Sequence, residues 1–176
     1  ARLPPLTRGD IQEHTPAMRA RHPDWSEADI GTNATSGSTG RPVRVEKLNA
    51  VYQPLYQALS MVDHHWHGRD AAKPAGAYRS DECGWIAAQC PKHRHYHVMA
   101  ATSLVEIVDD AGRPCAAGQA GRVLVTSLHS YAMPLIRYEL GDIAVPGPAC
   151  DCGITLPVIA RIEGRIGDRI TLPGGE

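Results

Sequence analysis

The run Thr-Ser-Gly-Ser-Thr-Gly-Arg-Pro at residues 35–42 carries the clearest chemistry in the sequence. Gly37 and Gly40 allow positive φ and a close approach to the main chain, and successive backbone N–H groups in such a turn can converge on one anion. Four hydroxyl side chains add further donors, namely Thr35, Ser36, Ser38 and Thr39. The run therefore predicts a phosphate-binding loop.

This loop is not of the Walker type, because no Gly-Lys-Ser/Thr sequence closes it. The alternative interpretation is a flexible Gly/Ser linker. Arg41 and Pro42 lead directly into the strand-like residues 43–45, and a linker does not require such an ordered exit. The sequence favours the phosphate-binding loop.

Three later segments accompany the loop: Tyr-Arg-Ser-Asp-Glu at 78–82, Met-Pro-Leu-Ile-Arg-Tyr-Glu-Leu-Gly-Asp at 133–142 and Gly-Arg-Ile-Gly-Asp-Arg-Ile at 164–170. In this order the four segments resemble the nucleotide-binding motifs of adenylate-forming enzymes, and the chain is similar to phenylacetate–coenzyme A ligases within that superfamily. The resemblance spans nearly the whole chain, without the family's long central stretch and C-terminal lid domain. It implies ATP, Mg²⁺ and coenzyme A as cofactors and a small-molecule carboxylic acid as substrate.

The resemblance also assigns roles to individual residues. The loop residues expected to hold phosphate are Thr35, Ser36, Gly37, Ser38, Thr39 and Gly40. The ring of Tyr78 is expected to stack on adenine, and Glu82 to bind Mg²⁺, which prefers such hard oxygen ligands. Asp142 is expected to accept hydrogen bonds from both ribose hydroxyls, and Arg165 to contact the nucleotide. Glu82 and Thr39 are the expected catalytic residues.

Each later motif has a plainer interpretation when it is taken alone. Glu82 would then be a surface carboxylate, and residues 133–142 a strand that ends in a Gly-Asp turn. The sequence also departs from many relatives at Arg79 and Asp81, which stand where those relatives carry Gly and Ser or Thr. The ordered set of four motifs nevertheless favours a nucleotide site.

A second constellation consists of cysteines and histidines. Two ligand pairs that are far apart in the sequence are typical of a structural zinc site that joins two loops. Some phenylacetate–CoA-ligase-like proteins carry Cys and His at matching places. The expected ligands are Cys90, His97, Cys150 and Cys152, with His93 as the substitute for His97. A closed site with four protein ligands would be structural, because no position remains for water.

The helical elements are predicted from caps and periodicity. Thr7 is followed by Asp10 three residues later, which indicates a capped helix start. Apolar residues recur at spacings of three and four from 48 to 66, which predicts an amphipathic helix. We interpret Tyr52 and Tyr56 on this helix as core residues. The histidines near its end are interpreted as solvated, namely His64, His65 and His67.

From residue 103 the pattern changes to a period of two. It predicts strands at 103–108, 122–127 and 132–138, with turn clusters at 109–112 and 118–121. Residues 22–34 are polar and are predicted to form a loop.

The expected fold class is mixed α/β (α+β): a portion of an adenylate-forming large domain with a small antiparallel, β-barrel-like part. We expect an N-terminal part at 1–97, a β-rich subdomain at 98–164 and a hinge stub at 165–176, with Asp168 as the pivot. The short stretch near 70–77 indicates either an internal deletion or ordered pieces joined under continuous numbering.

Composition limits the classes of partner. A net charge of −1 gives no reason to expect nucleic acid or an acidic membrane surface, and no run of 18 apolar residues is present. Five cysteines cannot all pair with one another, which favours metal ligation in a reducing cytoplasm. The N-terminus has neither a Met nor the pattern of a signal peptide. A homodimer is one option for assembly.

Two functional hypotheses follow. The first is an ATP-dependent carboxylate–CoA ligase, or its nucleotide-binding part, in which an acyl-adenylate forms and the thiol of coenzyme A then displaces AMP. The second is a zinc-stabilised, non-catalytic binding module derived from such a ligase. A phosphatase or kinase fragment is disfavoured, because no phosphoryl acceptor or Cys-x₅-Arg motif occurs.

Overall fold

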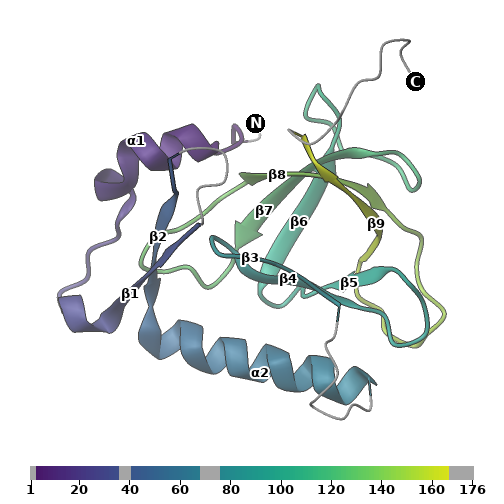
Figure 1. Cartoon of the computed structure of the whole chain (residues 1–176), viewed down its shortest axis with the longest axis horizontal. Helices are drawn as coiled ribbons and strands as arrows, with labels where there is room; N and C mark the ends of the chain where they lie inside the picture. The colour runs from purple at the N-terminus through teal and green to yellow at the C-terminus, as the bar shows by residue number, and fades with distance from the viewer. Residues whose placement is uncertain (1–2, 36–40, 68–75, 167–176) are drawn as a thin grey trace.

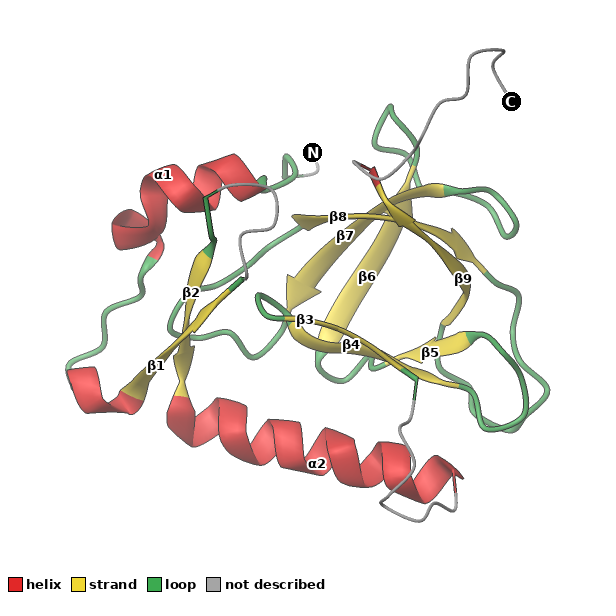
Figure 2. Cartoon of the chain, in the orientation of Figure 1, coloured by secondary structure: helices red, strands yellow, loops and turns green. Residues whose placement is uncertain are grey.

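The computed structural model describes residues 3–35, 41–67 and 76–166 (Figure 1). The elements within these ranges are, in chain order, α1 (Arg8–Met18), the 3-10 turn η1 (Glu27–Asp29), β1 (Ile30–Ala34), β2 (Arg44–Leu48), α2 (Asn49–His67), β3 (Ala77–Ser80), β4 (Gly84–Gln89), β5 (Tyr96–Val98), β6 (Ser103–Val108), β7 (Gly121–Ser127), β8 (Tyr138–Pro146) and β9 (Val158–Arg165). The architecture is a mixture of helices and antiparallel strands (Figure 2). The expected fold class is therefore confirmed.

The strands form two sheets. β1 and β2 form a two-stranded antiparallel sheet, and the other strands form a seven-stranded sheet of order β3-β4-β5-β9-β8-β7-β6. All neighbouring strands in the larger sheet are antiparallel. The expected boundary between residues 97 and 98 falls inside β5, so the division of the chain into these parts remains a prediction.

The main core lies against the seven-stranded sheet. It contains Ile86 from β4, Val123 from β7 and Tyr138 from β8, all of them fully or almost fully buried. Ile11 of α1 and Val45 of β2 join the same cluster, so the small sheet and the first helix pack on the large sheet. This arrangement places the start of α1 beside the phosphate-loop ends.

A second cluster fixes helix α2. Trp85, Ala88 and Met99 are buried, and Leu59 and Trp66 of α2 pack against them. β4 is consequently covered on both faces. Figures 1 and 2 show α2 running along one side of the molecule, below β3 and β4 in the view.

The predicted helix starts are largely correct. The backbone N of Asp10 donates to the Thr7 hydroxyl (3.2 Å), and the backbone N of Thr7 donates to the Asp10 carboxylate (2.7 Å), so the capping box is confirmed. The amphipathic stripe corresponds to α2. Pro54 lies inside α2, beyond its first turn.

Two interpretations of residues on α2 were wrong. Tyr52 and Tyr56 are not core residues, because their side chains line an open cleft. His67 is not solvated: its side chain is 7% exposed, and its Nδ1 lies 3.4 Å from a carboxylate oxygen of Asp63, which is equally buried. Of the other two histidines, His65 is exposed and His64 is half-buried.

Two predictions of local structure were also wrong. Residues 30–34 form strand β1 rather than a loop, because β2 provides backbone partners for a polar segment that has no alternating pattern. Residues 132–137 do not form a strand, and β8 begins only at Tyr138. Pro134 has no N–H for a sheet hydrogen bond, and Arg137 has a φ of 52°, which is outside the extended region.

The remaining strands and turns agree with the sequence pattern. β6 spans Ser103–Val108, and β7 pairs with it in a regular hairpin. Gly112 and Gly118 have positive φ in the two predicted turns. The predicted gap near 70–77 falls mostly on residues 68–75, outside the described ranges, as does the hinge stub from residue 167 onward.

Candidate functional site

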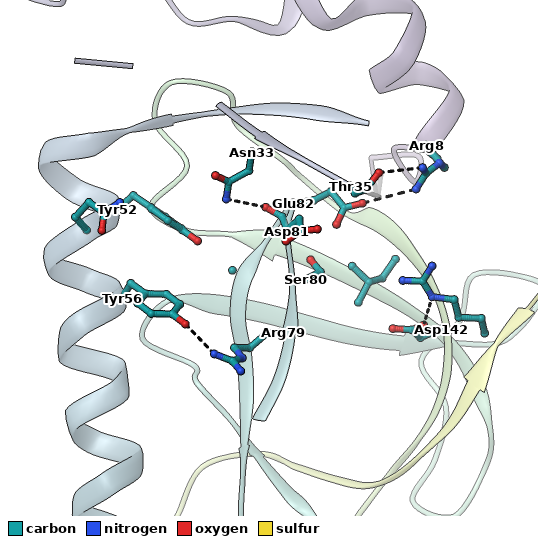
Figure 3. Close-up of a pocket in the computed structure, with 14 residues that line it drawn as sticks. Arg8, Asn33, Thr35, Tyr52, Tyr56, Arg79, Ser80, Asp81, Glu82 and Asp142 are labelled. Carbon is teal, nitrogen blue, oxygen red and sulfur yellow. Dashed lines mark hydrogen bonds and ion pairs between the residues drawn. The ribbon is translucent and has the colours of Figure 1, made fainter. Parts of the chain in front are cut away.

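A cleft of about 610 Å³ lies between α2, the start of α1 and the edge of the large sheet (Figure 3). Its walls come from several segments that are far apart in the sequence. The lining residues are Arg8, Asn33, Thr35, Tyr52, Gln53, Tyr56, Arg79, Ser80, Asp81, Glu82, Gly84, Leu140, Asp142 and Arg165. All four sequence motifs contribute to this set.

Thr35 marks the beginning of the expected phosphate loop at one side of the cleft. Its hydroxyl accepts hydrogen bonds from Arg8 Nη2 (3.1 Å) and from the backbone N of Val43 (3.0 Å), and its own backbone N donates to the Val43 carbonyl (3.0 Å). These bonds join the two ends of the loop to each other and to α1. The other expected phosphate-binding residues lie outside the described ranges, namely Ser36, Gly37, Ser38, Thr39 and Gly40.

Glu82 lies in the turn between β3 and β4 and is 6% exposed. Its Oε1 accepts a hydrogen bond from the Tyr138 hydroxyl (3.0 Å) and lies 3.9 Å from Arg8 Nη1. Burial, together with the neighbouring Glu82 carboxylate, raises the pKa of Tyr138 well above its ordinary value, so this hydroxyl stays a donor. The buried ammonium of Lys47 donates to the Glu82 carbonyl and fixes the same turn.

Asp142 lies on β8, directly after Gly141, which has a φ of 86°. Its Oδ2 accepts a hydrogen bond from the Tyr78 hydroxyl (2.6 Å), and its Oδ1 lies 3.6 Å from Arg165 Nε on the neighbouring strand β9. Burial and this hydrogen bond raise the pKa of Tyr78 far above its usual range. Asp142 is thus held by one buried donor and one exposed cation.

Tyr78 itself is 8% exposed, and its ring belongs to the main core rather than to the walls of the cleft. The structure therefore shows Tyr78 as a partner of Asp142. Its expected contact with adenine stays a prediction.

Sequence reasoning missed several residues of the cleft. The capping pattern of Thr7 and Asp10 gives no sign of a functional role for Arg8 between them, although its guanidinium reaches Thr35 and Glu82. Arg79 and Asp81 were noted as departures from the family pattern but received no role. The two tyrosines of α2 were assigned to the core. A single cation or tyrosine at an ordinary helix or strand position carries no local signal for such a site.

The four expected metal ligands meet outside the cleft: Cys90 follows β4, His97 lies on β5, and the other two cysteines lie in the connection from β8 to β9. The ligand atoms of Cys90, His97, Cys150 and Cys152 all lie within 4.8 Å of one another. Cys90 Sγ lies 3.9 Å from Cys150 Sγ, and Cys152 Sγ lies 3.3 Å from His97 Nε2. All five cysteines are free thiols in the described structure.

This geometry suits a tetrahedral ion. With metal–sulfur bonds near 2.3 Å, two sulfur ligands at a tetrahedral angle are about 3.8 Å apart, close to the observed spacing. His97 is fully buried, and its Nδ1 lies 3.4 Å from the Leu156 carbonyl. A proton on Nδ1 leaves Nε2 free to face the thiols. Burial also lowers the pKa of His97, which favours the neutral, ligating form.

His93, the expected substitute ligand, has a different partner. Its Nε2 lies 2.5 Å from an Asp151 carboxylate oxygen, and together with Cys150 these residues form a second, more exposed group. His95 received no role in the sequence interpretation. Its Nε2 lies 3.1 Å from the Sγ of Cys150, next to the expected ligand set.

Comparisons with known proteins point to one class of enzyme. No established family profile matches the chain. A phenylacetate–coenzyme A ligase from Thermus thermophilus is 35% identical over 92 residues, which make up 51% of this chain and 21% of that enzyme. The match thus covers about half of this chain and only about a fifth of its relative.

Solved structures of 2-hydroxyisobutyryl-CoA ligase have a similar fold. One, an open conformation in complex with 2-HIB-AMP and CoA, gives a TM-score of 0.68 at 15% identity over 99% of this chain and 66% of that one. Another, in the postadenylation state in complex with 2-HIB-AMP, gives a TM-score of 0.71 at 16% identity. The match covers 99% of this chain and 60% of that one. This chain therefore has the fold of part of an adenylate-forming CoA ligase, and the resemblance expected from its motifs is confirmed.

None of the helices in the described ranges is long and apolar enough to cross a membrane.

Proposed function

We propose that the chain carries the nucleotide-binding site of an ATP-dependent carboxylate–CoA ligase of the phenylacetate–CoA ligase type. One observation carries the proposal: Thr35, Glu82 and Asp142, which come from three distant motifs, line the same cleft. The similarity to CoA ligases in fold and in part of the sequence supports the same class of reaction.

The proposed reaction has two steps. A carboxylate oxygen of the acid attacks the α-phosphorus of ATP, the bond to the β-phosphate breaks, and an acyl-adenylate and pyrophosphate result. The thiol of coenzyme A then attacks the acyl carbonyl, gives up its proton, and AMP leaves. Such catalysis consists mainly of positioning and of stabilising charge that develops on phosphate oxygens, so no covalent nucleophile from the protein is required.

Each end of the cleft has a proposed role. The loop that starts at Thr35, with Thr39 as its catalytic hydroxyl, binds the phosphates. Asp142 accepts hydrogen bonds from the ribose hydroxyls, because a carboxylate suits a vicinal diol. Arg165 offers its remaining donors to the nucleotide, and Tyr78 holds Asp142 in place from the core. The Tyr78–Asp142 bond of 2.6 Å supports this arrangement.

Glu82 is the proposed magnesium ligand. Its carboxylate is a hard oxygen donor at the cleft wall, and its Oε1 already has Tyr138 as a partner. When bound, Mg²⁺ would neutralise charge on the triphosphate. Tyr138 and Arg8 orient the carboxylate towards the Thr35 side of the cleft.

We also propose a structural zinc ion at Cys90, His97, Cys150 and Cys152. The proposal is supported by the mutual distances of these ligand atoms and by the orientation of His97. The ion would join the end of β4, strand β5 and the β8–β9 connection. Free thiols and ATP-dependent chemistry fit a reducing cytoplasm, which is the proposed location.

The second candidate function is a zinc-stabilised binding module without catalysis. The observation that favours it is that the metal ligands are complete without any residue of the cleft.

Isothermal titration with ATP–Mg²⁺ separates the two candidates. The ligase proposal expects binding to the wild-type chain, and at least a tenfold loss of affinity in Asp142→Ala, about 1.4 kcal/mol. Asp110→Ala is the matched control, because Asp110 is an exposed turn residue outside the cleft. Zinc bound at one equivalent with no heat of nucleotide binding would support the module and overturn the ligase.

A further inference from the structure

Three of the described arginines line the cleft, and two of them face carboxylates. Arg8 lies 3.9 Å from Glu82, and Arg165 lies 3.6 Å from Asp142. Arg79 is different: within the described ranges no ion pair joins it to Asp81 or to any other carboxylate. Its Nη1 instead donates to the neutral hydroxyl of Tyr56 (2.8 Å). Among the residues that the structure describes, Arg79 is thus a cation of the cleft that forms no ion pair with a carboxylate.

The guanidinium of Arg79 is nevertheless held in one place. Its central carbon lies 5.0 Å from the ring centroid of Trp85, which is a cation–π contact. Trp85 is 6% exposed and packs edge-on against Tyr56, with 6.0 Å between ring centroids. A planar cation fixed by a ring and a hydroxyl loses little conformational freedom when it binds an anion. Such pre-organisation is typical of a recognition residue.

Trp85, which holds Arg79, borders the small crevice beside the cleft and has a donor of its own. The indole Nε1 of Trp85 is buried and makes no hydrogen bond within the described part of the chain. A buried donor without an acceptor is costly, on the order of 1–3 kcal/mol.

Arg79 lies away from the two ends assigned to the nucleotide. Figure 3 shows it beside Tyr56 of α2, whereas Thr35, Arg8 and Glu82 gather at one side and Asp142 at another. If the phosphates and the ribose occupy those two ends, as the proposed function requires, the third end is left for the acid substrate. This step rests on that proposed function.

Arg79 borders the open cleft of about 610 Å³. A crevice of about 20 Å³, bordered by Tyr52, Tyr56 and Trp85 among the described residues, adjoins the cleft, but Arg79 does not line it. A ligand in the cleft can therefore reach the guanidinium of Arg79.

We propose that Arg79 is a specificity-determining residue that binds a second anionic group of the acid. The substrate class is a dicarboxylic acid: one carboxylate is activated by ATP, and the other pairs with Arg79. Trp85 and Tyr56 hold the guanidinium for this pairing.

The test compares matched acids on the chain saturated with AMP. Butanedioate and pentanedioate are titrated beside butanoate and pentanoate, and phenylacetate is included as an aromatic probe. The dicarboxylates are expected to bind at least tenfold more tightly than the monocarboxylates of equal length. Arg79→Gln is expected to erase this preference, Arg79→Lys to keep part of it, and the affinity for AMP to stay within twofold in both variants.

Arg113→Gln is the matched control, because Arg113 is an exposed arginine in a turn outside the cleft, paired with Asp109. It should leave the preference unchanged. Equal binding of mono- and dicarboxylates by the wild type, or tighter binding of phenylacetate, would overturn the inference. So would a loss of ATP and AMP affinity in Arg79→Gln with the acid preference intact, since Arg79 would then serve a nucleotide phosphate. In each of these cases the wild-type chain still binds nucleotide, which leaves the proposed function standing. A wild-type chain that binds no nucleotide overturns both.

Discussion

The Tyr78 hydroxyl donates a hydrogen bond of 2.6 Å to Asp142 Oδ2, and this bond joins strands β3 and β8, which are not neighbours in the sheet. It fixes a carboxylate of the cleft from inside the protein. The other oxygen of Asp142 faces Arg165 and the cleft. Stability and ligand binding are therefore expected to be coupled at this pair.

Tyr78→Phe should reduce both the stability of the fold and the affinity for the nucleotide. The change keeps the buried ring but leaves the Asp142 oxygen without its donor, which is expected to lower the free energy of unfolding by about 2 kcal/mol. The affinity for AMP should fall as well, though by less than in Asp142→Ala. Urea denaturation and calorimetric titration measure the two effects. Tyr131→Phe is the control, because Tyr131 is 47% exposed. An unchanged unfolding free energy would contradict the coupling.

Glu82→Gln should remove the magnesium dependence of ATP binding. The amide oxygen can still accept from Tyr138, so the fold is expected to persist, while the charge needed by Mg²⁺ is lost. Titrations with ATP at increasing Mg²⁺ should show rising affinity in the wild type and a flat response in the variant. Binding of AMP without Mg²⁺ should remain within twofold.

For the magnesium experiment, Glu13→Gln is a suitable comparison, since Glu13 is exposed on α1. The assignment of Glu82 would be refuted by an equal magnesium response in wild type and variant.

Removal of the metal should destabilise the region where the end of β4, strand β5 and the β8–β9 connection meet. Elemental analysis is expected to give one zinc per chain, and Cys150→Ser should lose it. Chelation or this substitution is expected to lower the melting temperature by at least about 5 °C, which corresponds to roughly 2 kcal/mol for a chain of this size. Cys115→Ser removes a thiol outside the ligand set and should keep the zinc. Full zinc content in Cys150→Ser would refute the site.

The buried thiol of Cys83 predicts a pH dependence of stability. Burial raises the pKa of Cys83 from 9.0 to about 12. The folded state thus binds a proton that the unfolded state releases first, so the stabilisation is complete below pH 9 and is lost as pH rises from 9 towards 12. The slope from this group is at most about 1.4 kcal/mol per pH unit. Cys83→Ala should reduce the fall in unfolding free energy between pH 8.5 and 10. Identical pH profiles for wild type and variant would contradict this origin.

Much of the fold follows from local patterns in the sequence. The alternating residues of Ser103–Val108 and the capping pair of Thr7 and Asp10 specify their elements without help from distant residues. β1 could not be predicted in this way, because its polar residues become a strand only when β2 lies beside them. The segment before Tyr138 failed for a backbone reason: Pro134 and the positive φ of Arg137 interrupt an otherwise strand-like pattern.

Some residues of the site could likewise be predicted from the sequence, and others could not. Cys90, His97, Cys150 and Cys152 could be identified because such residues are uncommon and their spacing is informative, and the structure brings them together. Thr35, Glu82 and Asp142 were found through their motifs and line one cleft. Arg8 and Arg79 were missed, because an arginine is common on any surface, and only the fold brings these two to the cleft.

The central claim is that Thr35, Glu82 and Asp142 surround one bound nucleotide. A crystal structure of the chain soaked with AMP tests it most directly. The account predicts ribose hydroxyls at about 2.7–3.2 Å from the Asp142 carboxylate, with the phosphate towards Thr35. Density for AMP elsewhere on the molecule, or an empty cleft at saturating AMP, would contradict it.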